Sequence, residues 1–210
     1  MRKRLEQTLA PSFTALAPTS IPADDRHADL GGMAEGFDDK AQEEDMKALV
    51  VYYSRSGNTK AVAELIAAAI PADLEPLVEI GVNRKGLLGY LGAGRGGVFK
   101  KKSTLQTPSK DPVNYDLVFI GTPVWGWNLA PAVRSYMGQT NFGSAPVALF
   151  CTMGGSGQDK AFASMRAEAP NANVIGEMAV EAAAITNPVA LQQKIEDWVK
   201  GLAPEPESAT

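Results

Sequence analysis

The sequence is poor in the side chains that most enzymes use for nucleophilic and metal chemistry. Its 210 residues include one histidine, His27, and one cysteine, Cys151. His27 lies in the N-terminal tail, so the part expected to fold has no imidazole, which excludes the Ser-His-Asp mechanism and most zinc sites there. A lone cysteine excludes an intrachain disulfide and favours a reducing compartment, the cytoplasm. We therefore predict no catalytic side chain and no metal site, and expect a bound cofactor to supply any chemistry.

Long apolar runs and a strong charge of one sign are also missing. No stretch approaches the ~20 apolar residues needed to span a bilayer. Residues 1–4 are basic like the start of a signal peptide, but Glu6, Gln7 and Pro11 interrupt any hydrophobic segment after them, so we expect no secretion and no membrane insertion. The formal net charge is −4, and the sequence lacks the strongly basic face expected of a nucleic-acid-binding protein.

The first 45 residues differ from the remainder in charge and pattern. They carry five basic and ten acidic side chains, together with prolines and glycines and no sustained hydrophobic period. We predict a disordered acidic tail over 1–45, with a localisation or partner-binding arm as the alternative. Met46 opens directly into a strand pattern, so it is also a candidate for the true start of the protein. Residues 203–210 are predicted to be a disordered C-terminus.

Strand and helix patterns alternate between residues 46 and 202. Continuous apolar runs predict buried strands, and helical spacing with capping signals predicts the segments between them. Strands are expected over 48–53, 73–80, 117–121, 147–151 and 174–180, and helices over 58–70, 130–137, 160–167 and 188–202. Asn58 or Thr59 is expected to cap the first helix, and Pro76 suggests an edge strand. The pattern predicts an α/β fold, a doubly wound five-stranded parallel sheet with helices on both faces.

Ligands of such sheets bind beyond the carboxyl ends of the strands, where the strand order reverses. The first loop expected there covers residues 54–59. Its hydroxyl and amide side chains and its backbone N–H groups at a helix start predict an anion site, and Gly57 permits close approach. An ordinary capped turn is the alternative. The predicted ligand contacts are Ser54, Arg55, Ser56, Gly57, Asn58 and Thr59, of which Arg55 is the weakest candidate.

The second loop covers residues 121–128 and follows the third strand. Two tryptophans flank Gly126, and each must place an indole N–H, which makes them poor core residues. We predict a flat wall for an aromatic ring, with Trp125 as the preferred wall. The alternative for Trp127 is packing beneath the next helix. The predicted contacts are Thr122, Pro123, Val124, Trp125, Gly126 and Trp127.

The third loop covers residues 151–157 and follows the fourth strand. Three glycines within four residues let backbone N–H groups approach a ligand closely, whereas a flexible turn is the alternative. Cys151 ends an apolar strand and is expected to be a core residue. The predicted contacts are Thr152, Met153, Gly154, Gly155 and Gly157.

Residues 50–66 resemble the flavodoxin signature at every constrained position. Further resemblance, to a group of short bacterial and archaeal flavodoxin-family proteins, lies in residues 52–59, 121–125, 131–136 and 154–157. The resemblance implies the flavodoxin-like strand order 2-1-3-4-5 and one non-covalently bound FMN, with its phosphate in the first loop and its ring at the other two. A peptide at Gly126 is then expected to turn with the redox state of the flavin. The third loop departs from the family because it has no aromatic residue between Thr152 and Lys160.

Three functions remain open from the sequence. The first is a redox protein that carries electrons between a partner protein or small-molecule acceptor and its FMN. The second is an FMN enzyme that reduces a quinone with NAD(P)H on an open ring face. The third is a module of this fold that has lost FMN. Basic residues over 84–102 are either an exposed connection or a docking rim for an acidic partner or NADPH.

Overall fold

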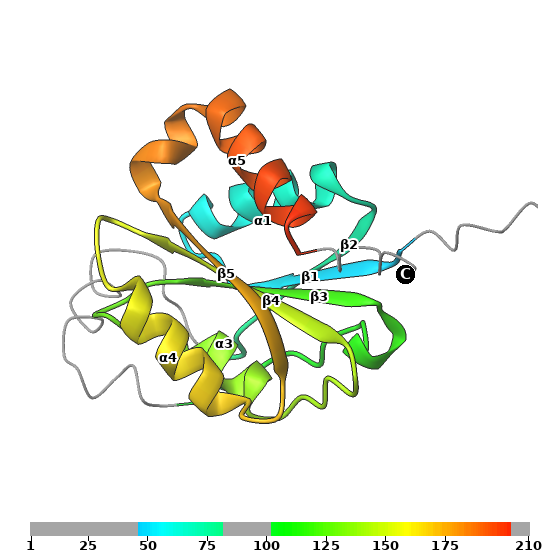
Figure 1. Cartoon of the computed structure of the whole chain (residues 1–210). Coiled ribbons are helices and arrows are strands. Elements are labelled where there is room, and N and C mark those ends of the chain that lie inside the picture. The colour runs from blue at the N-terminus through cyan, green and yellow to red at the C-terminus, as the bar shows by residue number, and fades with distance from the viewer. Residues whose placement is uncertain (1–45, 82–101, 203–210) are drawn as a thin grey trace, which may run out of the picture. The chain divides into compact units, whose positions relative to one another are not determined.

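The computed structural model describes residues 46–81 and 102–202 of the chain (Figure 1). They form a five-stranded, all-parallel sheet with the order β2-β1-β3-β4-β5, which confirms the predicted topology. The predicted tail, the C-terminal segment from 203 and nearly all of the basic 84–102 segment lie outside the described residues. The strands are β1 Ala48–Tyr52, β2 Ala72–Pro76, β3 Leu117–Pro123, β4 Pro146–Met153 and β5 Asn173–Glu181.

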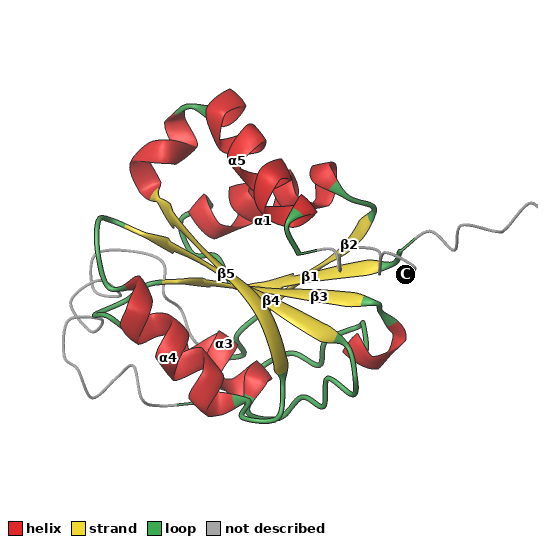
Figure 2. Cartoon of the chain, in the orientation of Figure 1, coloured by secondary structure: helices red, strands yellow, loops and turns green. Residues whose placement is uncertain are grey.

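Helices cover both faces of the sheet (Figure 2). Helices α1 and α5 lie on one face, and α3 and α4 lie on the other. Two short 3-10 turns, Pro112–Asn114 and Ala182–Thr186, complete the regular structure of the described residues. The helices are α1 Asn58–Ala69, α3 Pro131–Met137, α4 Gln158–Glu168 and α5 Pro188–Lys200.

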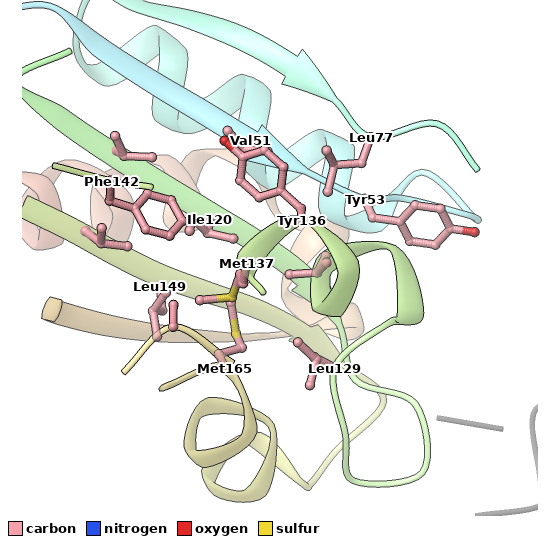
Figure 3. Packing of buried hydrophobic residues seen from close by; sticks show 14 of the residues in the cluster. Val51, Tyr53, Leu77, Ile120, Leu129, Tyr136, Met137, Phe142, Leu149 and Met165 are labelled. Atoms are coloured by element: carbon pink, nitrogen blue, oxygen red, sulfur yellow. The ribbon is translucent and has the colours of Figure 1, made fainter. Parts of the chain in front are cut away.

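Strand β1 shows why the apolar runs predict this sheet correctly. All five of its residues are buried, and alternate side chains enter the two cores on opposite faces. Leu49 and Val51 pack toward α3 and α4, in the core that Figure 3 shows. Ala48 and Val50 pack toward α1 and α5. A strand that is buried on both faces has no polar position, so it reads as a continuous apolar run.

One local prediction about the sheet is also confirmed, and the glycine near the end of β3 has a packing reason. Strand β2, which contains Pro76, pairs with β1 alone and therefore lies at an edge. Gly121 ends the apolar run of β3 because a side chain has no room there. A Cβ at this position would lie 2.1 Å from Cζ of Phe150, so the glycine leaves room for the ring of Phe150 from the neighbouring strand β4.

The prediction that Asn58 or Thr59 caps the first helix is wrong. The N-cap is Gly57, which has φ 97°, and no side chain caps α1. Helix α4 begins in the same way at Gly157, with φ 108°. Glycine reaches this left-handed region without the Cβ clash that other residues meet. Both helices thus start directly from a loop at the carboxyl edge of the sheet. The last helix begins differently, because the Asn187 side chain caps it by accepting a hydrogen bond from the Ala190 N–H at 3.3 Å, and Pro188 follows at the first helical position.

Candidate functional site

The three loops predicted to hold a ligand lie together at the carboxyl edge of strands β1, β3 and β4. The guanidinium carbon of Arg55 in the first loop lies 4.8 Å from the centre of the Trp125 ring in the second. The backbone N–H of Val124 donates to the carbonyl of Thr152 at 2.8 Å, which joins the second loop to the third. These contacts confirm that the loops meet, while the individual ligand contacts stay predictions.

The first loop presents an open helix start. The side chain of Ser54 accepts a hydrogen bond from the Gly57 N–H at 3.2 Å, which folds the loop back on itself. Ser56 and Gly57 are exposed, and a Cβ added at Gly57 would meet no atom within 4 Å. The N–H groups of the first turn of α1 have no side-chain acceptor at the cap. They therefore carry the partial positive charge that attracts an anion.

Thr59 is placed differently from the other residues of its loop. It is 1% exposed, and its hydroxyl lies 2.8 Å from the hydroxyl of Thr152, which is also buried. The pair ties the start of α1 to the end of β4, so the two hydroxyls join the first loop to the third. Thr59 and Thr152 are both predicted ligand contacts, and the structure gives their side chains this additional role.

We expect Thr59→Val to lower the free energy of unfolding by about 1.5 kcal/mol, because the Thr152 hydroxyl then stays buried without its partner. Chemical denaturation of the flavin-free protein measures this change. Thr59→Ser keeps the hydroxyl and serves as the control. The double variant Thr59→Val with Thr152→Val removes both polar groups, so its loss should be smaller than the sum of the two single losses. A purely additive double variant would contradict the pairing.

The second loop contains a tight two-residue turn. The backbones of Trp125 and Asn128 exchange two hydrogen bonds, 2.9 and 3.1 Å long, around Gly126 and Trp127. Both central residues have positive φ, 54° at Gly126 and 60° at Trp127, which is the pattern of a type I′ turn. Trp127 is the one non-glycine residue with positive φ among the residues described. A bulky side chain in this region carries strain, and such strain often marks a functional position.

The two tryptophans have different surroundings. Trp125 is partly buried against the core, with its ring edge-on to Tyr53 at 5.7 Å between centroids. Trp127 is 61% exposed, so the alternative that it packs beneath the following helix does not hold. The Lys160 ammonium lies 5.9 Å from the centre of the Trp127 ring. The structure thus presents Trp127 more openly than Trp125, which was the preferred wall from the sequence.

The third loop lies against this exposed indole. Gly157 has φ 108°, and a Cβ there would come within 2.7 Å of Cδ1 of Trp127. The glycine therefore serves both the start of α4 and the close contact with the ring. Gly154 and Gly155 are exposed, and a Cβ at either would meet no atom within 4 Å. Met153 is partly buried. The loop forms an open backbone surface beside Trp127.

The remaining predicted contacts of the second loop are buried or partly buried, and they support the loop rather than expose polar groups to a ligand. Thr122 is fully buried, and its hydroxyl accepts a hydrogen bond from the Ala130 N–H at 2.9 Å and donates to the Pro123 carbonyl at 3.1 Å. Pro123 and Val124 are partly buried. The bond to the Ala130 N–H joins the end of β3 to the residue before α3, so Thr122 stabilises the loop between these two elements.

Cysteine and metal chemistry find no support in the described part of the chain. Burial raises the pKa of the Cys151 thiol to about 12, so the thiol stays protonated at neutral pH. Its full burial confirms the expectation that it is a core residue. Residues 46–81 and 102–202 contain no group of three or more histidine, cysteine, aspartate or glutamate side chains that could hold a metal ion. No helix in these ranges is long and apolar enough to cross a membrane.

The sequence did not point to three residues that shape the site. Tyr53 supports Trp125 and donates from its hydroxyl to Glu79 at 2.8 Å. Asn128 closes the tight turn, and Arg134 donates to the Asn128 side chain at 2.8 Å. Tyr53 and Arg134 stand within matched segments of the family resemblance. That signal marked their positions without indicating what they contact.

Similar solved structures support the fold. A candidate flavoprotein from Bacteroides uniformis is 22% identical over 74% of this chain and 98% of its own, with a TM-score of 0.62. One from Bacteroides eggerthii is 22% identical over 76% and 99%, also with a TM-score of 0.62. A flavoprotein from Lactobacillus acidophilus, solved in complex with FMN, is 26% identical over 73% and 99%, with a TM-score of 0.54.

The family comes from a comparison of sequence with family models. No curated protein matches the sequence. The flavodoxin family model matches residues 96–202, just over half of the chain, and this range includes the second and third loops. The first loop lies outside the match, and its assignment depends on the strand order and on its contacts with the other two loops. On this match and this fold, the chain belongs to the flavodoxin family.

Proposed function

We propose that the protein binds FMN non-covalently across its three loops and carries electrons through it. The observation that carries this proposal is the arrangement at one sheet edge of an uncapped helix start and an exposed tryptophan beside a glycine-rich loop. The first suits a phosphate, and the second suits a flat aromatic ring. The family assignment adds support.

The first loop fits the phosphate of FMN. Its charge is attracted by the N–H groups at the start of α1, which no side chain caps. The open space at Gly57 leaves room for close approach. The side chains that would complete the cradle are neutral hydroxyls and amides, as in Ser56 and Asn58. The guanidinium of Arg55 lies over the Trp125 ring, so it joins the first loop to the second.

The second and third loops fit the ring of the flavin. Trp127 offers an exposed aromatic surface. Gly154 and Gly155 leave backbone groups open to polar ring atoms, because no atom of the described residues lies within 4 Å of a Cβ built at either glycine. FMN, when bound, accepts and donates electrons, and the protein's residues bind it, orient it and limit its contact with water. The flavoprotein from Lactobacillus acidophilus was solved in complex with FMN, which supports the same ligand here.

The visible spectrum of the purified full chain tests this proposal. The protein is incubated with FMN, the free flavin is removed, and the spectrum is recorded during stepwise reduction. We expect a retained flavin with bands shifted from those of free FMN, released by heating. Reduction in two separate one-electron steps would support electron carriage. A colourless protein after incubation would contradict the proposal and favour the third function, a module that has lost FMN.

One observation favours a second candidate, a reductase that uses NAD(P)H to reduce a quinone. The third loop presents Gly154, Gly155 and Ser156 as exposed residues, and the loop itself contains no aromatic side chain that could stack on a ring. A nicotinamide or quinone could then reach the flavin beside Trp127, where the Lys160 ammonium lies 5.9 Å from the centre of the ring. Steady-state turnover of NADPH with a quinone separates the two functions. Turnover favours the reductase, whereas a flavin reduced only by partner proteins or chemical reductants favours the carrier.

The partner and the compartment are also part of the proposal. We propose that the acceptor is a redox protein or a small molecule such as a quinone, since a flavin can pass electrons to either. The cytoplasm is the compartment we propose, since the single cysteine makes no disulfide framework.

A further inference from the structure

Arg134 connects three parts of the protein from within helix α3. Its side chain is 9% exposed, and its Nη1 forms an ion pair with Oε1 of Glu168 at the end of α4. Its Nη2 donates to Oδ1 of Asn128 at 2.8 Å. One guanidinium thus joins helix α3 to helix α4 and to the last residue of the second loop.

Asn128 is the residue that closes the turn. Its backbone N–H and carbonyl pair with the carbonyl and N–H of Trp125. Its side-chain Oδ1 also accepts from the Leu129 N–H at 2.9 Å. The same oxygen therefore receives one bond from the backbone that leaves the loop and one from Arg134. These two bonds fix the Asn128 side chain, and its backbone fixes the turn that carries Trp127.

The turn needs such an anchor because its geometry is unfavourable for its sequence. Trp127 occupies a left-handed conformation with φ 60° while most of its side chain is exposed. Packing around the indole is too limited to hold this conformation alone. A bond from a charged donor in a buried place is stronger than a neutral one. The fixed fork of arginine can serve Glu168 and Asn128 at once, whereas the ammonium of lysine is a point charge.

We propose that Arg134 is a positioning residue that acts through Asn128 to hold Trp127 in the geometry presented to the flavin. The flavin part rests on the proposed function, while the positioning part concerns the flavin-free protein as well. Glu168 has a different role, because it balances the buried charge of Arg134 from the end of α4 and forms its ion pair with Nη1, whereas Nη2 donates to Asn128. This difference supplies a matched control, since both residues belong to the same ion pair.

Nuclear magnetic resonance of the flavin-free full chain tests the positioning. The three tryptophans give three indole N–H signals, which single substitutions assign. In Arg134→Lys we expect the Trp127 signal to move and its mobility on the picosecond to nanosecond scale to rise. In Glu168→Gln we expect a lower melting temperature and an unmoved Trp127 signal. Trp198, which packs against Phe119 in the opposite core, reports in each variant that the fold is intact.

Two changes at Asn128 keep the test decisive if Arg134→Lys does not fold. Asn128→Ala removes the acceptor but leaves the ion pair, so it should move the Trp127 signal as Arg134→Lys does. Asn128→Asp retains an oxygen that accepts both bonds, so it should leave the signal near its original position. An unmoved Trp127 in Asn128→Ala, or an equal shift in Glu168→Gln, would overturn the proposal.

Flavin titration of the same variants separates this proposal from the proposed function. We expect Arg134→Lys and Asn128→Ala to bind FMN about fivefold more weakly, because each loses the contribution of one hydrogen bond to the position of Trp127. Asn128→Asp should bind FMN as the unaltered protein does. If the unaltered protein takes up no FMN while Trp127 responds as expected, the positioning stands and the flavin function fails. If FMN binds and Trp127 does not respond, the flavin function stands and the positioning role fails.

Discussion

Gly57→Val is expected to weaken FMN binding about 100-fold, the loss of roughly two hydrogen bonds to a charged group. Gly57 has φ 97°, a conformation that a β-branched residue strongly disfavours. The substituted loop must change its backbone, which turns the N–H groups at the start of α1 away from the phosphate. Because a Cβ here would meet no atom within 4 Å, the effect comes from the backbone and the ligand. Fluorescence titration of FMN measures the affinity.

Two variants make this result specific. Gly143 is also exposed, with φ 58°, and lies in the connection from α3 to β4. Gly143→Val should therefore lower the free energy of unfolding by about 2 kcal/mol, through the same disfavoured backbone conformation as Gly57→Val. Unlike Gly57→Val, it should leave the affinity for FMN unchanged. Arg55→Ala should weaken binding much less than Gly57→Val, since neutral groups and backbone supply most of the phosphate contacts. Equal affinities in Gly57→Val and Arg55→Ala would contradict the assignment of the first loop to the phosphate.

The elements of this fold could be predicted because they are buried and regular. Strands β1, β3 and β4 are buried on both faces for nearly their whole length, so their apolar runs had few alternative interpretations. Their ends were less certain. Strand β2 was predicted to reach Ile80 but ends at Pro76. The Leu77 N–H makes a last bond to the Tyr52 carbonyl of β1 at 2.8 Å. The chain then leaves β1, and the Ile80 N–H donates instead to the Thr104 carbonyl at 2.8 Å.

The details of the site depend on contacts that local sequence does not encode. The capping prediction failed because α1 begins at Asn58 with Gly57 as its N-cap, which leaves the Thr59 hydroxyl to pair with that of Thr152, far along the chain. The role of Arg134 was hidden because Glu168 belongs to another helix. The backbone conformation of Trp127 was harder still to predict, since turn positions with positive φ favour glycine and asparagine and not a bulky residue. Sequence patterns report what is locally favourable, and this turn is locally unfavourable.

Removal of the Trp127 ring is expected to have the second largest effect. Trp127→Ala and Trp127→Gly should each weaken FMN binding about 30-fold, because a stacked aromatic ring contributes roughly 2 kcal/mol. Both should also shift the visible bands of the bound flavin. Trp125→Ala should instead lower stability, because Trp125 packs against Tyr53 and the core. A band shift confined to Trp125→Ala would restore Trp125 as the wall of the flavin site.

The two Trp127 variants also differ from each other in a direction that tests the strain. At most exposed positions alanine is more stable than glycine, because glycine loses more freedom on folding. At φ 60° the order should reverse, with Trp127→Gly more stable than Trp127→Ala by about 1 kcal/mol in chemical denaturation of the flavin-free protein. Both variants lack the indole, so lost packing cancels in the comparison. If alanine is the more stable, Trp127 does not hold this conformation in solution, and the turn is not the anchored element that Asn128 and Arg134 indicate.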